Sequence, residues 1–222
     1  MNYLAHQYVA RRIRRESDAP ALFFAGNILP DILAMSGDGR LRSAGEHTGP
    51  LADGIRLHLS TDRRFHTLPA FHEAQAQANR LLLSALWVVP PHRRFFLAHV
   101  MTELALDAAI LATEPALPDD LYGSLAAALR DGLVPLTETI SGKSAPNLRT
   151  TAERFIESRY LHGYSSAEGL ASSLIRACKR AAVPLCEDPR DVAELARVFT
   201  ELSLFIVPRT ADLLRISVAD AG

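Results

Sequence analysis

The stretch HRRFFLAHVMTELALDAAILAT, residues 92–113, decides the fold class of this chain. Its apolar side chains occupy nearly every side of a helix, and a helix of that kind is typical of a buried core. Along it His99, Glu103 and Asp107 recur at intervals of four residues, so they form one polar stripe. Ionised carboxylates inside a core are costly unless they are paired or bound to a cation. The stretch therefore predicts a helical core that carries a candidate ion-binding face.

The sequence on both sides continues the helical pattern. Apolar residues recur at spacings of three and four, and no convincing alternating pattern of a strand is present. The segment from residue 20 should be helical with a break at Asn27–Pro30, because proline removes a helical hydrogen bond. Pro208 should kink the last helix for the same reason, and the Gly- and Ser-rich residues 36–50 should form a loop. Further helices are expected over 2–15, 51–65, 68–87, 121–130, 150–161, 165–182 and 188–217.

Length and composition predict a single domain. The chain has 222 residues, of which 48% are hydrophobic and 22% charged, and this is enough to bury a core without disulfides. We expect an all-α, compact multi-helix bundle over residues 1–222. Its metal-site half would be 1–113, and 117–222 would be a helical packing half. The polar stretch SGKSAPNLRT, residues 141–150, is the best candidate linker.

Charge and cysteine content exclude several function classes. A net charge of −1 provides no general attraction to nucleic acid, and the arginines within 11–15 are interpreted as a solvated helix face. We find no apolar run of about 18 residues, so no transmembrane segment is expected. Cys178 and Cys186 do not form a CxxC motif and are interpreted as reduced thiols. The first residues lack the order of a signal peptide, so a cytoplasmic location is expected.

A second polar stripe lies in GIRLHLSTDRRFH, residues 54–66. His58, Asp62 and His66 are spaced by four residues and share a helix face, although His66 lies near a loop and is interpreted as solvated. Imidazole nitrogens and carboxylate oxygens are the ligands that divalent metals such as zinc, manganese or iron accept. Two facing helices could therefore enclose one or two ions, and a spare carboxylate could serve as a general base.

Other interpretations of these polar residues stay open. Glu103 could pair with a buried arginine such as Arg56 or Arg94 instead of a metal. Asn27 and Asp31 could be turn and helix-capping residues around the predicted break. An isolated pair of polar residues one turn apart is usually structural, but two stripes of this kind favour a metal site.

Three motifs carry a resemblance to a known family. MNYLAH (1–6), AGNILPD (25–31) and GIRLHLSTDRRFH (54–66) occur in the order seen in the bacterial acyl carrier protein phosphodiesterases, a divergent branch of the HD-type metal phosphohydrolases. The resemblance covers roughly residues 1–110, and a weaker similarity exists to zinc-dependent phospholipase C-like proteins. This chain departs from the family where Leu59 follows His58 and where HVMTELALD (99–107) replaces an Asp-x-x-x-Asp-His order.

The resemblance implies an HD-domain-like fold and a metal-dependent phosphodiester hydrolase that uses metal-activated water as the nucleophile. The cofactor would be manganese, zinc or iron, and the substrate a phosphoester, with acyl carrier protein as a candidate. Apart from the resemblance, a homodimer is a candidate assembly, with the C-terminal half as a candidate dimer surface. The expected metal ligands are His6, Asp31, His58, Asp62, His99 and Glu103. The expected catalytic carboxylates are Asp62, Glu103 and Asp107. The expected substrate-binding residues are Asn27, Arg63 and Arg64.

Two other functions compete with this prediction. The helical scaffold could be a non-catalytic binding protein in which the polar stripes are buried ion pairs. It could also be a phospholipase C-like hydrolase that works at a lipid surface, which requires exposed apolar side chains, for example around residues 81–87. Metal content distinguishes the first alternative from the hydrolase, and vesicle binding tests the second.

Overall fold

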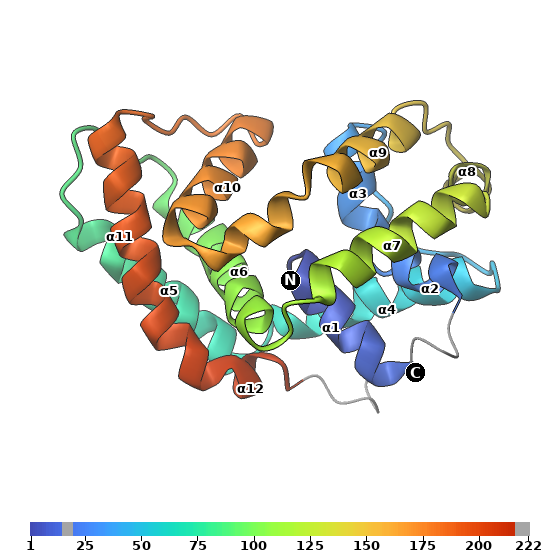
Figure 1. Cartoon of the computed structure of the whole chain (residues 1–222), viewed down its shortest axis with the longest axis horizontal. Helices are drawn as coiled ribbons and strands as arrows, with labels where there is room; N and C mark the ends of the chain where they lie inside the picture. Colours follow the sequence, from blue (N-terminus) through green and yellow to red (C-terminus); the bar gives the residue numbers. More distant parts are fainter. Residues whose placement is uncertain (15–19, 216–222) are drawn as a thin grey trace.

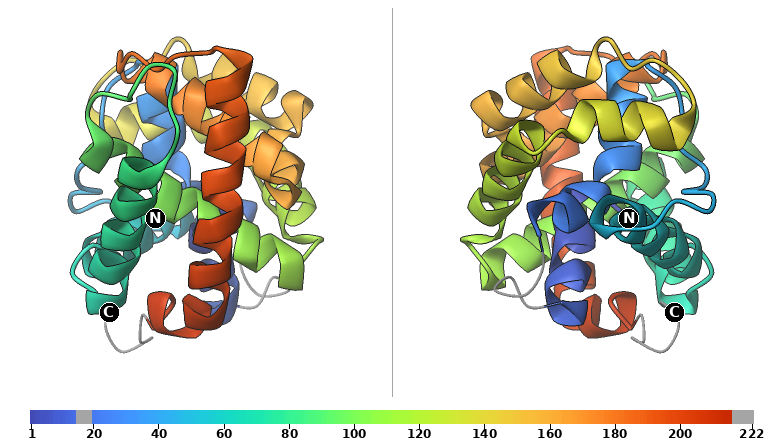
Figure 2. Two further views of the ribbon diagram at one scale, coloured as in Figure 1. Left: turned by 90° about the vertical axis from the view of Figure 1, so that its left-hand side faces the viewer. Right: turned by 90° about the vertical axis from the view of Figure 1, so that its right-hand side faces the viewer.

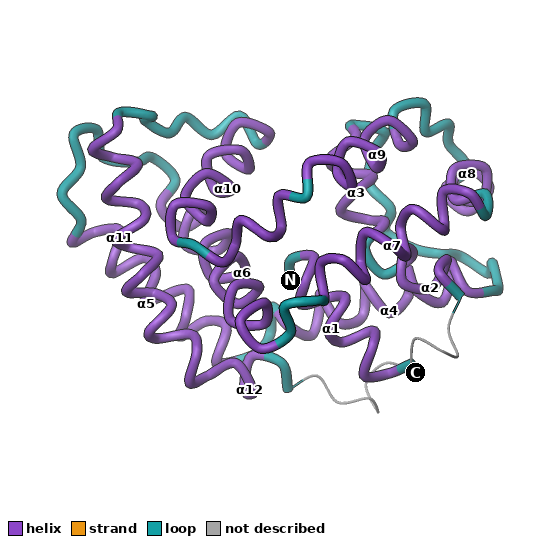
Figure 3. Tube along the Cα trace, in the orientation of Figure 1, coloured by secondary structure: helices purple, strands orange, loops and turns teal. Residues whose placement is uncertain are grey.

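Helix α6 (Arg94–Thr113) contacts helices from both ends of the chain, as its apolar sequence predicts. The computed structural model describes residues 1–14 and 20–215, and every element in those ranges is an α-helix or a short 3₁₀ helix (Figure 3). The prediction of an all-α multi-helix bundle is therefore confirmed. The other elements are α1 (Tyr3–Ile13), α2 (Ala21–Gly26), α3 (Leu29–Ser36), α4 (Pro50–Phe65), α5 (Pro69–Ser84), α7 (Leu117–Arg130), α8 (Leu133–Ser141), α9 (Leu148–Ser158), η1 (Tyr160–Ser165), α10 (Ala167–Arg180), α11 (Pro189–Ile206), η2 (Val207–Arg209) and α12 (Thr210–Leu213).

The helices from the two halves of the sequence are interleaved in space. Helices α5, α6, α10 and α11 pack together at one side of the molecule, whereas α2, α4 and α7 pack at the other (Figures 1 and 2). Helix α1 contacts both α6 and α7, so the start of the chain lies between the two sides. One continuous apolar core extends from Met1 to Leu213. Of the predicted linker 141–150, only residues 142–147 connect α8 to α9; Ser141 ends α8 and Leu148 begins α9.

Proline explains most of the breaks between helices. Pro30 stands in the first turn of α3, where a missing backbone N–H removes no helical bond, and the break falls at Asn27 and Ile28 as predicted. Pro208 lies in η2, which separates α11 from α12 and confirms the predicted kink. Helix α8 was not predicted from the sequence, because it contains Pro135 and several β-branched residues. Gly132 and Gly142, both with positive φ, bound this helix.

The long apolar helix α6 bears on the expectation that the chain has no transmembrane segment. By length and composition α6 could cross a membrane, since an 18-residue window within it has a mean hydropathy of 1.6. It is the one helix of which this is true in the part of the chain that the structure describes. Of that window 61% is buried inside the protein, and a core helix passes the same test. Packing within the bundle is therefore a sufficient reason for its apolar composition.

Two glycines bring helices α2 and α4 into backbone contact. A Cβ atom added to Gly54 would lie 2.1 Å from the Phe23 carbonyl oxygen and 2.9 Å from the Asn27 nitrogen. A Cβ added to Gly26 would lie 2.4 Å from the Leu51 carbonyl oxygen. Only glycine fits at such distances, so these residues set the separation of the two helices. The close approach brings the Asn27 carbonyl within hydrogen-bond distance of a histidine on α4.

Candidate metal centre

Two groups of metal-ligand side chains lie close together around the start of α1. The first group consists of His66 at the end of α4 with His99 and Glu103 on α6. The second consists of His6 on α1, Asp31 on α3 and His58 on α4. The ligand atoms within each group all lie within 4.8 Å of one another. The structure therefore contains His/Asp/Glu groups that could hold a metal ion, as the sequence predicted.

The first group forms a nearly equilateral triangle of ligand atoms. His66 Nε2 lies 3.3 Å from His99 Nε2, and each of these nitrogens lies 3.2 Å from Glu103 Oε1. Around a metal about 2.0–2.1 Å from each tetrahedral ligand, neighbouring ligand atoms are separated by about 3.3–3.4 Å. The triangle matches one face of such a tetrahedron. Two imidazoles and one carboxylate that leave a position open are a common ligand set of catalytic metal sites.

The second group contains a histidine whose ring nitrogens have no hydrogen-bond partner. The ring of His6 is fully buried, and neither of its nitrogens is bonded to any described group. It stacks on the His58 ring with a centroid separation of 4.0 Å, and His58 Nε2 lies 3.9 Å from Asp31 Oδ1. Burial is the main reason that the pKa of His6 lies well below its ordinary value, so its imidazole is neutral. A neutral imidazole with an unsatisfied nitrogen is the form that binds a metal.

Backbone carbonyls orient two of these histidines. His58 Nδ1–H donates to the Asn27 carbonyl at 2.9 Å, and His66 Nδ1–H donates to the Asp62 carbonyl at 2.9 Å. When each ring carries a single proton, that proton lies on Nδ1, so the Nε2 lone pair faces the other ligands of its group. Metal-binding histidines are commonly oriented by such bonds to the second nitrogen. Asn27 itself is held because its side-chain amide donates to the His6 carbonyl at 2.7 Å.

A positive charge lies between the two groups. The amino group of Met1 is 2.6 Å from Asp62 Oδ1 and 3.1 Å from Glu103 Oε1. Burial opposes the ionised form of Glu103, but the Met1 ammonium, His66 and His99 keep its pKa well below the ordinary value. The Asp62 carboxyl likewise has a lowered pKa despite burial, because His66 and the ammonium stabilise its charge. The surroundings of these carboxylates thus favour a cation.

Protonation of His66 follows from the same carboxylates. Hydrogen bonds to Asp62 and to Glu103 raise its pKa to about 9, against the opposing effect of burial. A metal at the first group must therefore displace a proton from this ring. The Asp62 side chain is 36% exposed, His99 also 36% and His66 29%, so solvent reaches this group.

The helical periodicity explains how one sequence stripe serves both groups. His58, Asp62 and His66 follow one another at single-turn intervals along α4. His58 joins the second group, His66 joins the first, and Asp62 lies between them against the Met1 ammonium. His99 and Glu103 are one turn apart on α6 and complete the first group. The sequence stripes therefore indicated the right helices, but not how their residues are divided.

Several predicted site residues occupy other roles. Asp107, expected as a catalytic carboxylate, is fully buried and accepts bonds from the backbone N–H groups of Leu4 and Ala5, at 3.0 and 2.8 Å. It thereby satisfies donors at the start of α1 and cannot meet a substrate. Asn27, expected to bind substrate, is also fully buried and positions His58. Arg63 and Arg64 are exposed on the last turn of α4, outside both ligand groups.

Two further interpretations from the sequence are wrong. His66 is not simply solvated, since its Nε2 contacts both His99 and Glu103. Glu103 does not pair with Arg56, which bonds Asp53 and carbonyls of the preceding loop. The partner of Glu103 that sequence reasoning missed is the amino group of Met1. The four-residue spacing between Asp62 and His66 was the one sequence signal that predicts His66 as a ligand.

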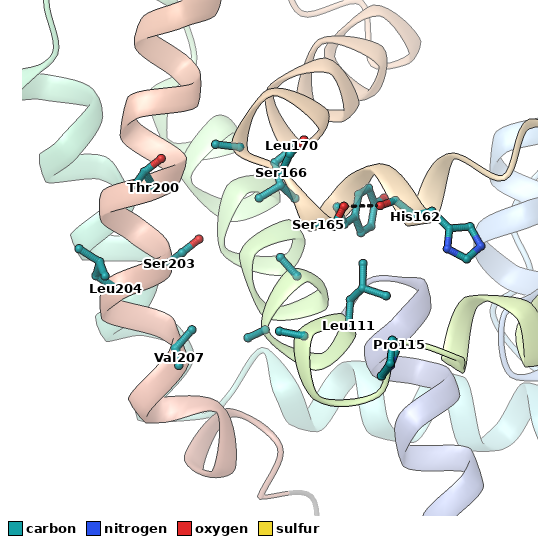
Figure 4. Close-up of a pocket in the computed structure, with 15 residues that line it drawn as sticks. Leu111, Pro115, His162, Ser165, Ser166, Leu170, Thr200, Ser203, Leu204 and Val207 are labelled. Carbon is teal, nitrogen blue, oxygen red and sulfur yellow. Dashed lines mark hydrogen bonds between the residues drawn. The ribbon is translucent and has the colours of Figure 1, made fainter.

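A large apolar pocket lies apart from these groups. It has a volume of about 740 Å³ and is bounded by α6, η1, α10 and α11 (Figure 4). Ala112, Leu170 and Leu204 contribute to its apolar lining, and Ser165 at its edge donates to the His162 carbonyl. None of the predicted site residues lines this pocket. His162 also lines the pocket, and its Nε2 lies 2.8 Å from Asp119 Oδ1. It belongs to neither of the two ligand groups.

Comparison of the chain with known protein families, with curated proteins and with solved structures gave no match.

Proposed function

We propose that this protein is a metal-dependent phosphoric ester hydrolase of the kind implied by the resemblance to acyl carrier protein phosphodiesterases. The observation that carries the proposal is the triangle of His66 Nε2, His99 Nε2 and Glu103 Oε1, whose edges of 3.2–3.3 Å fit a single divalent ion. The buried and unpartnered nitrogens of His6 support a second ion held with Asp31 and His58. Zinc, manganese and iron all accept this mixture of nitrogen and oxygen ligands.

A divalent ion bound here supplies a Lewis acid for a phosphoryl oxygen and lowers the pKa of a coordinated water. The chain's own groups would do the remaining work. Asp62 lies one turn from His58 and one turn from His66, so its carboxylate is adjacent to both ligand groups. It is ionised and partly exposed, so an oxygen of Asp62 could accept a hydrogen bond from an attacking water and orient it. Glu103 and His99 would hold the geometry of the first group.

The substrate class is proposed from the same chemistry. A phosphoester presents anionic oxygens, which a site with one or two cations stabilises most in the transition state. The exposed Arg63 and Arg64 follow Asp62 directly on α4 and would offer positive charge to a substrate that approaches this end of the helix. Acyl carrier protein is a candidate substrate within this class.

Metal analysis of variants tests this proposal. We expect about one or two equivalents of divalent metal in the wild-type protein, with a loss in His99→Ala from the first group and a separate loss in His6→Ala from the second. His72→Ala is the control, because His72 is exposed on α5 and belongs to neither group. Hydrolysis of bis(p-nitrophenyl) phosphate should fall in parallel with the metal content. Full metal content and activity in both site variants would refute the assignment.

One observation favours a second candidate function, a non-catalytic scaffold with buried ion pairs. The Met1 ammonium already forms ion pairs with both Asp62 and Glu103, at 2.6 and 3.1 Å. In that case the protein would contain no stoichiometric metal after reconstitution with zinc or manganese. Its melting temperature would also be the same with and without EDTA, since no ligand would stabilise the folded state.

A further inference from the structure

The corner between α5 and α6 exposes an unusual number of apolar side chains. We define the α5–α6 corner as residues 83–95, which comprise the end of α5, the connecting loop and the start of α6, at the left in Figure 1. Eight large hydrophobic side chains are exposed in the described part of the chain, and five belong to this segment. They are Leu83, Leu86, Val88, Val89 and Phe95. Leu86 and Phe95 are 86% and 73% exposed, so water, not protein, surrounds them.

The exposed loop is held in place by hydrogen bonds from α11. Asp191, which is 1% exposed, accepts from the backbone N–H groups of Val88 and Val89 at 2.7 and 3.2 Å. Glu194 accepts from the Leu86 N–H at 2.7 Å. Trp87 anchors the same loop from within, since its indole N–H donates to the Leu82 carbonyl at 2.8 Å. The apolar side chains are therefore displayed from a fixed backbone, so little ordering is required when they bind a partner.

The charges at the corner are positive. His92, Arg93 and Arg94 are exposed, and among described residues neither arginine has an ion-pair partner. The nearby carboxylates of Asp191 and Glu194 are turned inward to the loop amides. Arg94 also shares a shallow pocket of about 280 Å³ with Leu83 and Leu86. Apolar and cationic groups thus occur side by side on one projecting surface.

We propose that the α5–α6 corner docks this protein onto an anionic phospholipid surface. Apolar side chains on a projecting loop can enter the interfacial region of a bilayer, and adjacent arginines are attracted to anionic headgroups. A convex loop suits a deformable lipid surface better than a rigid protein groove, and the charge complementarity selects anionic lipid. Phe95 is one helical turn before His99, so docking would also place the first ligand group near the membrane.

This inference does not rest on the proposed hydrolase activity, because lipid binding requires no metal. The two are tested by separate measurements, metal content and vesicle binding. Loss of one leaves the other standing.

Vesicle sedimentation with the full chain tests the proposal. We expect the wild-type protein to sediment with vesicles of equimolar phosphatidylcholine and phosphatidylglycerol, and much less with phosphatidylcholine alone. Leu86→Ser/Phe95→Ser should weaken binding at least about tenfold, because two apolar side chains no longer leave water. Arg93→Gln/Arg94→Gln should weaken it about fivefold for each arginine, and added salt should reduce the wild-type affinity.

Matched controls exclude a general effect of surface mutation. Leu204→Ser removes a leucine that is 75% exposed near the other end of α11, about 20 Å along that helix from Asp191. Arg130→Gln/Arg154→Gln removes two exposed arginines on α7 and α9. Both controls should bind vesicles like the wild type. Circular dichroism and melting curves establish that every variant is folded, since all of the altered side chains are exposed.

Trp87 provides a second readout. It is the single tryptophan of the chain and lies within the corner, so its fluorescence should be quenched by brominated anionic lipids. The proposal is overturned if the wild type does not bind anionic vesicles, or if either corner variant binds as well as the wild type. It is also overturned if Leu204→Ser weakens binding equally. A wild-type dimer that Leu86→Ser/Phe95→Ser converts to a monomer, without vesicle binding, would identify a second copy as the partner instead.

Discussion

Replacement of Gly54 by alanine should disrupt both the fold and the second ligand group. The new methyl carbon would lie 2.1 Å from the Phe23 carbonyl oxygen, whereas real contacts of this kind are essentially never shorter than 3.0 Å. Helix α2 must therefore move away from α4 by about 1 Å, because backbone atoms cannot rotate out of the way. A shift of that size lengthens the 2.9 Å bond between His58 and the Asn27 carbonyl beyond an effective hydrogen bond.

The expected loss of stability follows from these two effects. Overpacking of a tight interface costs about 1–3 kcal/mol, and a buried donor left unsatisfied costs about 1–3 kcal/mol more. The sum of about 2–6 kcal/mol corresponds to a melting temperature lower by roughly 5–20 °C for a chain of this length. Metal held by the second group should be lost as well, since His58 is no longer oriented.

Gly123 offers a matched control for the same substitution. It lies within α7, and a Cβ added there meets no atom within 4 Å. Gly123→Ala should therefore stabilise the protein by about 0.5–1 kcal/mol through the better helix propensity of alanine. Urea unfolding followed by circular dichroism measures both variants. A Gly54→Ala protein as stable as the wild type, or a Gly123→Ala protein that loses as much stability, would refute the argument from the α2–α4 contact.

Three other predictions address the site and its supports. Zinc at about 100 times its dissociation constant should raise the melting temperature by roughly 5–10 °C in the wild type and in His72→Ala, and by less in His66→Ala, which retains only the second ligand group. Burial raises the pKa of Asp107 from 3.8 to about 7, so the folded protein retains a proton that the unfolded chain releases. The stability contributed by this group should fall as the pH rises from about 4 to 7, and urea titrations should show that Asp107→Asn removes that part of the slope. Asp191→Ala should lower the free energy of unfolding by about 1–3 kcal/mol, because two loop N–H groups lose their acceptor; an unchanged urea midpoint would contradict this.

The fold class was predictable because it depends on local periodicity. Apolar residues at spacings of three and four identify most of the helices, and prolines predict the breaks at Asn27–Pro30 and at Pro208. Helix α8 was missed, since Pro135 and its β-branched neighbours have poor helix propensity. Its stability comes instead from tertiary burial, for example of Leu133 and Thr137, which a local pattern does not report.

The ligand groups were predictable only as candidates. The four-residue spacing of His58 and Asp62, and of His99 and Glu103, places each pair on one helix face. The same spacing also included Asp107, which the structure uses to hold the start of α1. A sequence pattern shows which residues share a helix face. Which neighbour each of them contacts depends on the point along the helix at which another helix packs against it.

By itself the sequence determined an all-helical chain, an apolar central helix and two polar stripes able to bind metal, because these properties depend on the order of side chains along single helices. Only the tertiary structure decided that α4 divides its stripe between two groups, that His66 joins His99 and Glu103, and that Asp107 is a structural group. The physical reason is distance. Metal ligands must lie within a few ångströms of a common point, and that separation is set by the contacts between helices, such as the approach of Gly26 and Gly54.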